Sequence, residues 1–163
     1  MLARECDNYI ATHYYPDVSS GEYRWGFRCE NLENQMFKDS SIDLVVTQDV
    51  FEHILHPDRA FREIARTLKP GCAHVFTVPW YYWQKTVVRA QERDGKIEHL
   101  LPPEYHGNPI SEGGSLVIRE WGYDMCDFIH QYSGMFTLAL HIFNPYKGIE
   151  AEFLEVFISW KPD

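Results

Sequence analysis

The clearest hydrophobic pattern in the chain is a strand, helix, strand sequence in its first half. Ile42–Thr47 is a continuous apolar run of the kind found in parallel strands buried on both faces, and Ala73–Val78 is a second such run. Between them, apolar residues recur at steps of three and four, which predicts an amphipathic helix that ends at Lys69-Pro70-Gly71: Phe61, Ile64, Ala65 and Leu68. A crossover helix between two strands implies that the strands are parallel, so we expect an α/β fold.

Weaker patterns flank this unit. They predict strands at Asn8–His13 and Arg24–Cys29, helices at Lys85–Glu92 and Arg119–Tyr132, and an antiparallel pair of strands at Phe136–Phe143 and Glu152–Trp160. Residues 79–115 are rich in aromatic residues and prolines and are too long for a plain loop, so we interpret them as an insertion that covers a substrate. We expect one domain over residues 1–163, with a mainly parallel sheet and an antiparallel carboxyl-terminal edge.

Composition excludes several classes of protein. The chain has 163 residues, 45% of them hydrophobic, which is enough for one core. Its 15 basic and 24 acidic residues give a formal net charge of −9, so we expect no nucleic-acid partner. The four cysteines form no C-x-x-C pair, which argues against a zinc ribbon. No apolar stretch is long enough for a membrane helix and no early run is typical of a signal peptide, so we expect a cytoplasmic protein.

The segment from Asp39 to Val78 resembles the class I S-adenosylmethionine-dependent methyltransferases, in the subgroup often labelled type 11. An acidic residue near the start of the strand, the E-H pair and the helix that ends in L-K-P-G all match that family: Asp43, Glu52, His53, Glu63, Arg66, Leu68, Lys69, Pro70 and Gly71. The resemblance implies a Rossmann-like fold, S-adenosylmethionine or S-adenosylhomocysteine as cofactor, and a small-molecule substrate.

The sequence also departs from that family, mainly on the cofactor side. The family begins with a strand and a G-x-G-x-G turn that approaches the cofactor closely, and no such segment precedes Asn8. The resemblance places the remaining cofactor contacts at His13, Glu30, Asn31 and Leu32. The position of Thr47 and Gln48 at the end of a parallel strand adds these two residues. His13 replaces the usual acid, and Cys72 replaces the second glycine after Lys69-Pro70. We therefore expect a truncated fold with weakened methylation, and a homo-oligomer that covers the sheet edge and apolar face left open by the missing elements.

The candidate catalytic residues are Asp49, His53, Tyr105 and His106. Residues just beyond parallel strands line the ligand crevice of open α/β sheets, which favours Asp49, although this residue could instead cap a turn before Phe51. Tyr105 and His106 stand in a polar group, Glu104–Pro109, that suits a substrate lid with an acid and a base, or equally a braced loop.

A metal site is a less favoured alternative. Asp49, His53 and His106 would supply two imidazoles and one carboxylate, if residues 49–53 formed a helical turn. Three functions therefore stay open from the sequence: a methyltransferase relative, a metal-assisted enzyme of other chemistry, and a non-catalytic oligomeric binding protein.

Overall fold

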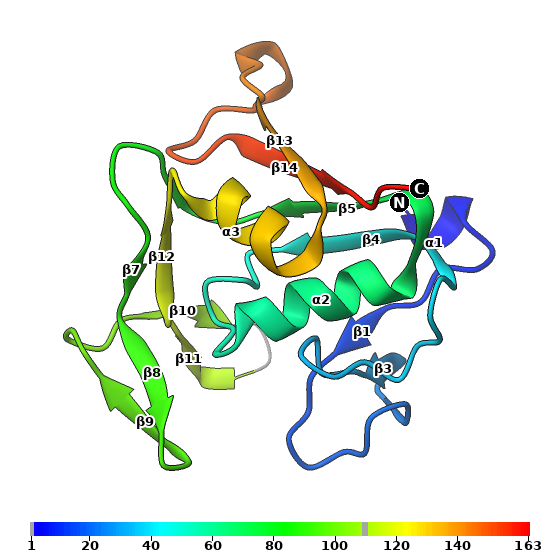
Figure 1. The fold of residues 1–163 in the computed structure, drawn as a ribbon, viewed down its shortest axis with the longest axis horizontal. Helices are drawn as coiled ribbons and strands as arrows, with labels where there is room; N and C mark the ends of the chain where they lie inside the picture. Colours follow the sequence, from blue (N-terminus) through cyan, green and yellow to red (C-terminus); the bar gives the residue numbers. More distant parts are fainter. Residues whose placement is uncertain (1, 109–110) are drawn as a thin grey trace.

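The centre of the protein is a four-stranded sheet in the order β13-β14-β5-β4, seen in a computed structural model that describes residues 2–108 and 111–163 (Figure 1). Its strands are β4 (Ile42–Gln48), β5 (Leu68–Thr77), β13 (Phe136–His141) and β14 (Glu155–Trp160). β4 and β5 are parallel, whereas β14 is antiparallel to both β5 and β13. The sheet is thus mixed, and our prediction of a mainly parallel sheet was wrong, because the antiparallel carboxyl-terminal hairpin makes up half of it.

The predicted strand, helix, strand unit is present. Helix α2 (Pro57–Thr67) begins with a proline in its first turn. Asp58 lies in the same turn, where the positive end of the helix dipole favours a negative charge. Strand β5 begins at Leu68, directly after the helix, and therefore includes the Lys69-Pro70-Gly71 segment that we expected to end the helix. The backbone N–H of Gly71 donates to the carbonyl of Lys161, so contact with the carboxyl-terminal segment extends the strand.

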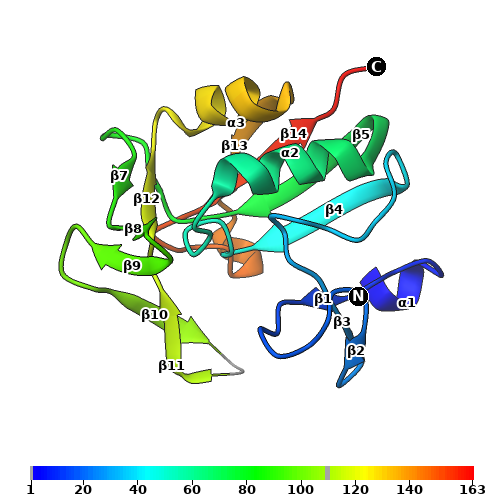
Figure 2. The same ribbon diagram turned by 60° about the horizontal axis from the view of Figure 1, so that its bottom comes forward.

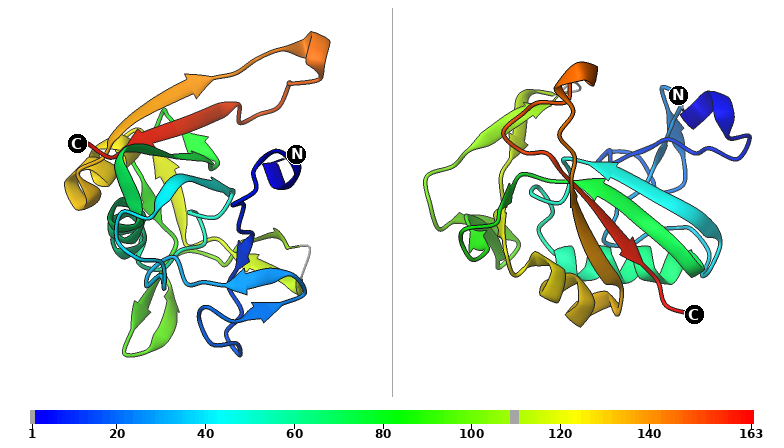
Figure 3. Two further views of the ribbon diagram at one scale, coloured as in Figure 1. Left: turned by 90° about the vertical axis from the view of Figure 1, so that its right-hand side faces the viewer. Right: turned by 90° about the horizontal axis from the view of Figure 1, so that it is seen from above.

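Helices α2 and α3 (Met125–Ser133) lie on the same face of the four-stranded sheet (Figure 3). Their buried side chains and those of the sheet form the core, which includes Phe51, Phe61, Ile64, Phe76, Trp121, Met125, Ile129 and Phe157. Gly134 ends α3 in the left-handed conformation that favours glycine. The helix predicted from Arg119 was too long at its start, because β12 (Arg119–Gly122) pairs with β6 (Trp80–Tyr81) and β7 (Val87–Val88).

The opposite face of this sheet exposes a set of apolar side chains. Leu44 and Val46 of β4 are 48% and 50% exposed, and Leu138 of β13 is 47% exposed. The register pairs Val46 with Val75 and Leu138 with Ile158, so these residues share one face across all four strands. We call this set, with Phe136 and Leu140 of β13, the open face.

The amino-terminal segment forms a separate small sheet in the order β1-β3-β2. A short helix α1 (Leu2–Glu5) precedes it, and its strands are β1 (Thr12–His13), β2 (Tyr23–Arg24) and β3 (Phe27–Cys29). Trp25 and Gly26 both have positive φ, as a tight hairpin turn requires, so the predicted strand Arg24–Cys29 is interrupted there. The predicted strand Asn8–His13 is reduced to its last two residues.

The described part of residues 79–115 consists largely of short hairpins (Figure 2). After β6 and β7 come β8 (Ala90–Arg93), β9 (Lys96–His99), β10 (Tyr105–Asn108) and β11 (Ser111–Leu116). The predicted helix Lys85–Glu92 is wrong, because Asp94 and Gly95 take positive φ in a tight turn that pairs β8 with β9. Pro109, the end of the predicted lid motif, lies outside the described residues.

The carboxyl-terminal hairpin confirms the predicted antiparallel pair. β13 pairs with β14 from Phe136 opposite Trp160 to His141 opposite Glu155, and a short 3-10 helix, η1 (Pro145–Lys147), lies between them. In the part of the chain that the structure describes, no helix is long and apolar enough to cross a membrane.

Candidate functional site

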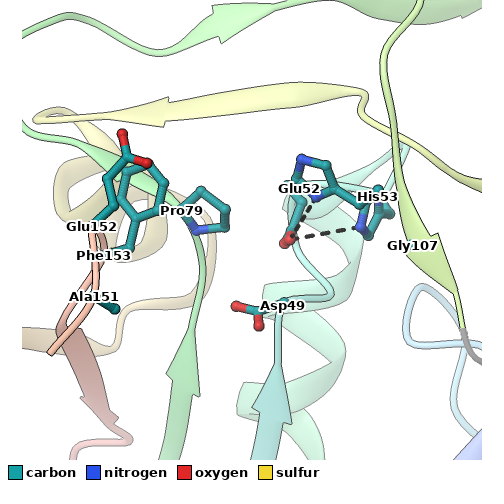
Figure 4. Close-up of a pocket in the computed structure, with 9 residues that line it drawn as sticks. Asp49, Glu52, His53, Pro79, Gly107, Ala151, Glu152 and Phe153 are labelled. Atoms are coloured by element: carbon teal, nitrogen blue, oxygen red, sulfur yellow. Dashed lines mark ion pairs between the residues drawn. The ribbon is translucent and has the colours of Figure 1, made fainter. Parts of the chain in front are cut away.

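A pocket of about 480 Å³ lies beyond the carboxyl ends of β4 and β5 (Figure 4). Four segments that are distant in the sequence form it: the turn after β4, the residue that follows Val78, strand β10, and the segment that leads into β14. Its lining residues are Asp49, Glu52, His53, Pro79, His106, Gly107, Ala151, Glu152 and Phe153. This is the position at which open α/β sheets bind ligands.

The turn after β4 is held in place at both ends. Asp49 has a φ of 49°, and its backbone N–H and carboxylate both bond to Thr77 at the end of β5, at 3.0 Å each. Phe51 is fully buried and stacks on Phe61 of α2, with ring centroids 4.1 Å apart. These contacts fix the positions of Glu52 and His53 at the pocket.

Glu52 is the most unusual side chain in the pocket. It is 1% exposed, and neither carboxylate oxygen has a hydrogen-bond partner within the described structure. Its Oε1 atom lies 3.6 Å from Nε2 of His53 and 3.7 Å from Nδ1 of His106, which is too far for a hydrogen bond. Burial raises the pKa of Glu52 to about 7, because the charged carboxylate loses its hydration.

Two histidines flank this carboxylate. Nδ1 of His53 lies 2.8 Å from the carbonyl oxygen of Leu116, and since a carbonyl can only accept, Nδ1 carries the proton. Burial lowers the pKa of His53, so its neutral form is favoured and its Nε2 presents a lone pair towards Glu52. The ring of His106 stands edge-on to that of His53, with centroids 5.2 Å apart.

The β10–β11 hairpin brings His106 to the pocket. A Cβ atom at Gly114 of β11 would lie 2.6 Å from the backbone oxygen of His106, so only glycine permits this close approach. Gly114 also has a φ of 70°, which glycine adopts without strain. Gly114 therefore shapes the hairpin that delivers the imidazole.

Three of the four predicted catalytic residues meet in this pocket: Asp49, His53 and His106. Tyr105 does not line it and is 56% exposed, because successive side chains of a strand point to opposite faces. The predicted grouping of Asp49 with the two histidines as possible metal ligands is corrected, since the carboxylate that lies within 4 Å of both imidazoles is that of Glu52. Residues 49–53 form no helical turn, and the helix begins only at Pro57.

The side chains expected to bind the cofactor have other partners. Glu30 is 4% exposed, and its two oxygens accept hydrogen bonds from Nε of Arg28 at 2.7 Å and from the backbone N–H of Met36 at 2.9 Å. His13 packs its ring against Tyr15, with centroids 4.6 Å apart.

The other expected cofactor residues divide between local structure and a second pocket. Asn31 accepts from the backbone N–H of Glu33 at 2.9 Å, and Leu32 packs against the core. The Thr47 hydroxyl lies 2.9 Å from Nε2 of the buried His74. Gln48 lines a neighbouring pocket of about 340 Å³, which also includes Asp49. The structure therefore does not gather these side chains in one described pocket.

Sequence reasoning did not select several residues of the pocket. Glu52 was visible as half of the E-H pair, but nothing local showed that its carboxylate would be buried without a partner. Glu152 and Phe153 precede β14 and reach the pocket only because the hairpin folds back beside β5. No sequence signal pointed to these two residues.

Comparison with known proteins supports the motif analysis. The family of the methyltransferase domain matches residues 2–76, just under half of the chain. This segment of the chain is thus similar to methyltransferase domains. A comparison with curated proteins gave no match.

Solved structures show the same fold at low sequence identity. A Haloferax volcanii methyltransferase, solved in complex with the Trm112 methyltransferase activator, has a TM-score of 0.54 and 17% identity. The alignment covers 84% of this methyltransferase-like chain and 61% of the Haloferax protein. An S-adenosylmethionine-dependent methyltransferase from Mesorhizobium loti has a TM-score of 0.50 and 13% identity, over 85% of this chain and 70% of that one. The chain thus spans about two thirds of the length of these proteins and shares their Rossmann-like α/β fold.

Proposed function

We propose that this methyltransferase-like protein binds a small molecule in the pocket beyond β4 and β5. The observation that carries the proposal is the convergence of Asp49, Glu52, His53 and His106 in one pocket of about 480 Å³ at the carboxyl ends of adjacent parallel strands. Local packing alone does not account for so many polar groups in one place.

The lining of the pocket indicates the class of ligand. Three carboxylates, those of Asp49, Glu52 and Glu152, and two imidazoles line the pocket, whereas Pro79 and Phe153 provide an apolar wall. A small molecule with a hydroxyl or amine group and a flat apolar part suits this lining, because its polar hydrogens would meet acceptors. The histidines are also placed to take a proton from such a group.

S-adenosylmethionine is the cofactor that the family relationship favours, and the Mesorhizobium relative is described as dependent on it. The side chains that the resemblance assigns to this cofactor, Glu30 and Asn31 among them, bond within the chain. Because these side chains are already bonded to other groups of the protein, they do not fit a site that would hold the cofactor through side-chain contacts. We therefore derive no step through the cofactor. This contrast with the pocket favours the second candidate function, a reaction other than methylation in the same pocket.

A homo-oligomer remains part of the proposal. The open face presents Leu44, Val46 and Leu138 at about half exposure, whereas α2 and α3 lie on the other face of the sheet (Figure 3). A second copy that covered this face would remove the apolar surface from water, which is the usual source of association energy.

Ligand binding tests the proposal. S-adenosylhomocysteine at up to millimolar concentration should release measurable heat with the wild-type protein if the cofactor binds, and no heat would exclude the methyltransferase part. A thermal-shift screen of small hydroxyl and amine compounds tests the pocket itself. Hits should be lost in His106→Asn and kept in Tyr105→Phe, whose side chain lies outside the pocket. Hits that survive His106→Asn would show that the ligand binds elsewhere.

A further inference from the structure

The carboxylate of Glu52 is buried, and the described residues around it do not compensate its negative charge. It is 2% exposed at the side chain, and neither oxygen has a hydrogen-bond partner among the described residues. A buried carboxylate without a partner is costly, and proteins normally compensate it with a counter-charge or a bound cation. The atoms that face it in the pocket are imidazole nitrogens of His53 and His106.

The nearer imidazole cannot supply that compensation in its neutral form. Since Nδ1 of His53 donates to Leu116, its Nε2 presents a lone pair to Glu52 at 3.6 Å. Two acceptors that face each other repel, and a positive charge between them turns the repulsion into attraction. The bond from Nδ1 to a carbonyl is also the usual way in which proteins orient a metal-binding histidine.

The spacing of the three groups suits one metal ion. Each of Glu52, His53 and His106 offers a ligand atom, and these atoms all lie within 4.8 Å of one another. Ligand atoms about 2.1 Å from a tetrahedral ion are about 3.4 Å apart, and the two distances from Glu52 Oε1 are 3.6 and 3.7 Å. Small side-chain rotations are therefore sufficient to close the site.

We propose that Glu52, His53 and His106 bind a divalent transition-metal ion. Imidazole nitrogens with one carboxylate favour Zn²⁺ or Fe²⁺ over Mg²⁺ or Ca²⁺, which prefer oxygen ligands alone. Three protein ligands leave a coordination position open towards the pocket, where an oxygen or nitrogen of a small molecule can bind. Glu104 lies 3.9 Å from the other ring nitrogen of His106, on the outside of the site.

This inference is independent of the small-molecule function, because metal binding is measured without any organic ligand. Untagged protein is stripped with chelator, dialysed, and titrated with Zn²⁺ by calorimetry and with Co²⁺ by visible absorption. We expect one ion per chain, and Co²⁺ bands typical of a four- or five-coordinate site with nitrogen ligands. Failure of S-adenosylhomocysteine to bind would leave this result unchanged.

Matched variants locate the site. Glu52→Gln and His106→Asn should each weaken Zn²⁺ binding at least 100-fold, whereas Tyr105→Phe, whose side chain lies outside the pocket, should change it less than threefold. His56→Asn is the control for a surface site, because His56 pairs with Glu92 at 2.9 Å outside the pocket. Circular dichroism at matched temperature confirms that each variant is folded.

Three results would overturn the proposal. The first is no stoichiometric binding by the wild-type protein, and the second is unchanged affinity in Glu52→Gln. The third is loss of binding in His56→Asn with retention in His106→Asn, which would place the ion on the surface.

Discussion

The imidazole of His74 in β5 is completely buried, and its Nε2 atom lies 2.9 Å from the hydroxyl of Thr47 in β4. The ring also stacks on Phe76, with centroids 4.5 Å apart. Burial lowers the pKa of His74 from 6.5 to about 3, because the charged ring would lose its hydration. The parallel strand pair is therefore joined through a neutral histidine.

This burial predicts a loss of stability in acid. Because the folded-state pKa lies below the unfolded one, the unfolded chain binds the extra proton between pH 6.5 and 3, and stability falls as pH falls through that range. At pH 5 the loss is about 2 kcal/mol relative to pH 7. Urea denaturation at both pH values measures the free energy of unfolding. The loss of stability at pH 5 should be absent in His74→Gln and present in His99→Gln, which is the control because His99 lies on an exposed strand. An identical pH dependence in wild type and His74→Gln would contradict the neutral buried ring.

Arg66 of α2 anchors the segment that leads into β4. Its guanidinium donates to the backbone carbonyls of Gln35 and Phe37, at 3.0 and 2.8 Å, and pairs with Glu63 at 2.7 Å. Arg66→Ala should lower the free energy of unfolding by about 2 kcal/mol, because several charge-assisted bonds are lost together. Arg62→Ala on the same helix loses one exposed ion pair and a cation–π contact with Tyr132, and should cost at most about 1 kcal/mol. Equal effects of the two substitutions in chemical denaturation would refute the anchoring role.

Glu52 should destabilise the metal-free protein at alkaline pH. Its folded-state pKa is raised from 4.5 to about 7, so its contribution to stability is present below pH 4.5 and is lost as pH rises through 7. In chelator at pH 8, Glu52→Gln should be more stable than wild type by up to about 3 kcal/mol, and the two should converge near pH 4.5. Thermal denaturation at pH 4.5 and 8 measures the difference. A variant less stable than wild type at pH 8 would argue against an uncompensated carboxylate.

The open face predicts self-association. Light scattering of the wild-type protein should give a mass above the 19.2 kDa of one chain. Leu44→Glu places a charge on the open face and should shift the mass towards that of the monomer. Leu100→Glu is the matched control, because Leu100 is also 48% exposed but lies on the hairpin segment after β9. A monomeric wild-type protein at the concentrations tested would exclude the homo-oligomer.

The sequence by itself determined the β4, α2, β5 unit and the carboxyl-terminal hairpin. These elements have strong local patterns: a continuous apolar run, a helical repeat from Phe61 to Leu68, and a proline at the first turn of the helix. The family relationship was carried by the same segment, since its motif residues are contiguous in the chain. Arg66 and Glu63 of that motif hold structure together, which is why the motif indicated fold more reliably than activity.

Only the tertiary structure decided which side chains form the candidate site. Local spacing favoured Asp49 as partner of His53, but the turn after β4 directs Asp49 to Thr77 and brings Glu52 close to both imidazoles. His106 arrives from a hairpin more than fifty residues away, and tertiary pairing also made strands of residues that alone favoured a helix. Contacts between distant segments bury Glu52 and remove the hydration of its carboxylate. This burial raises the pKa of Glu52 and so determines its chemistry.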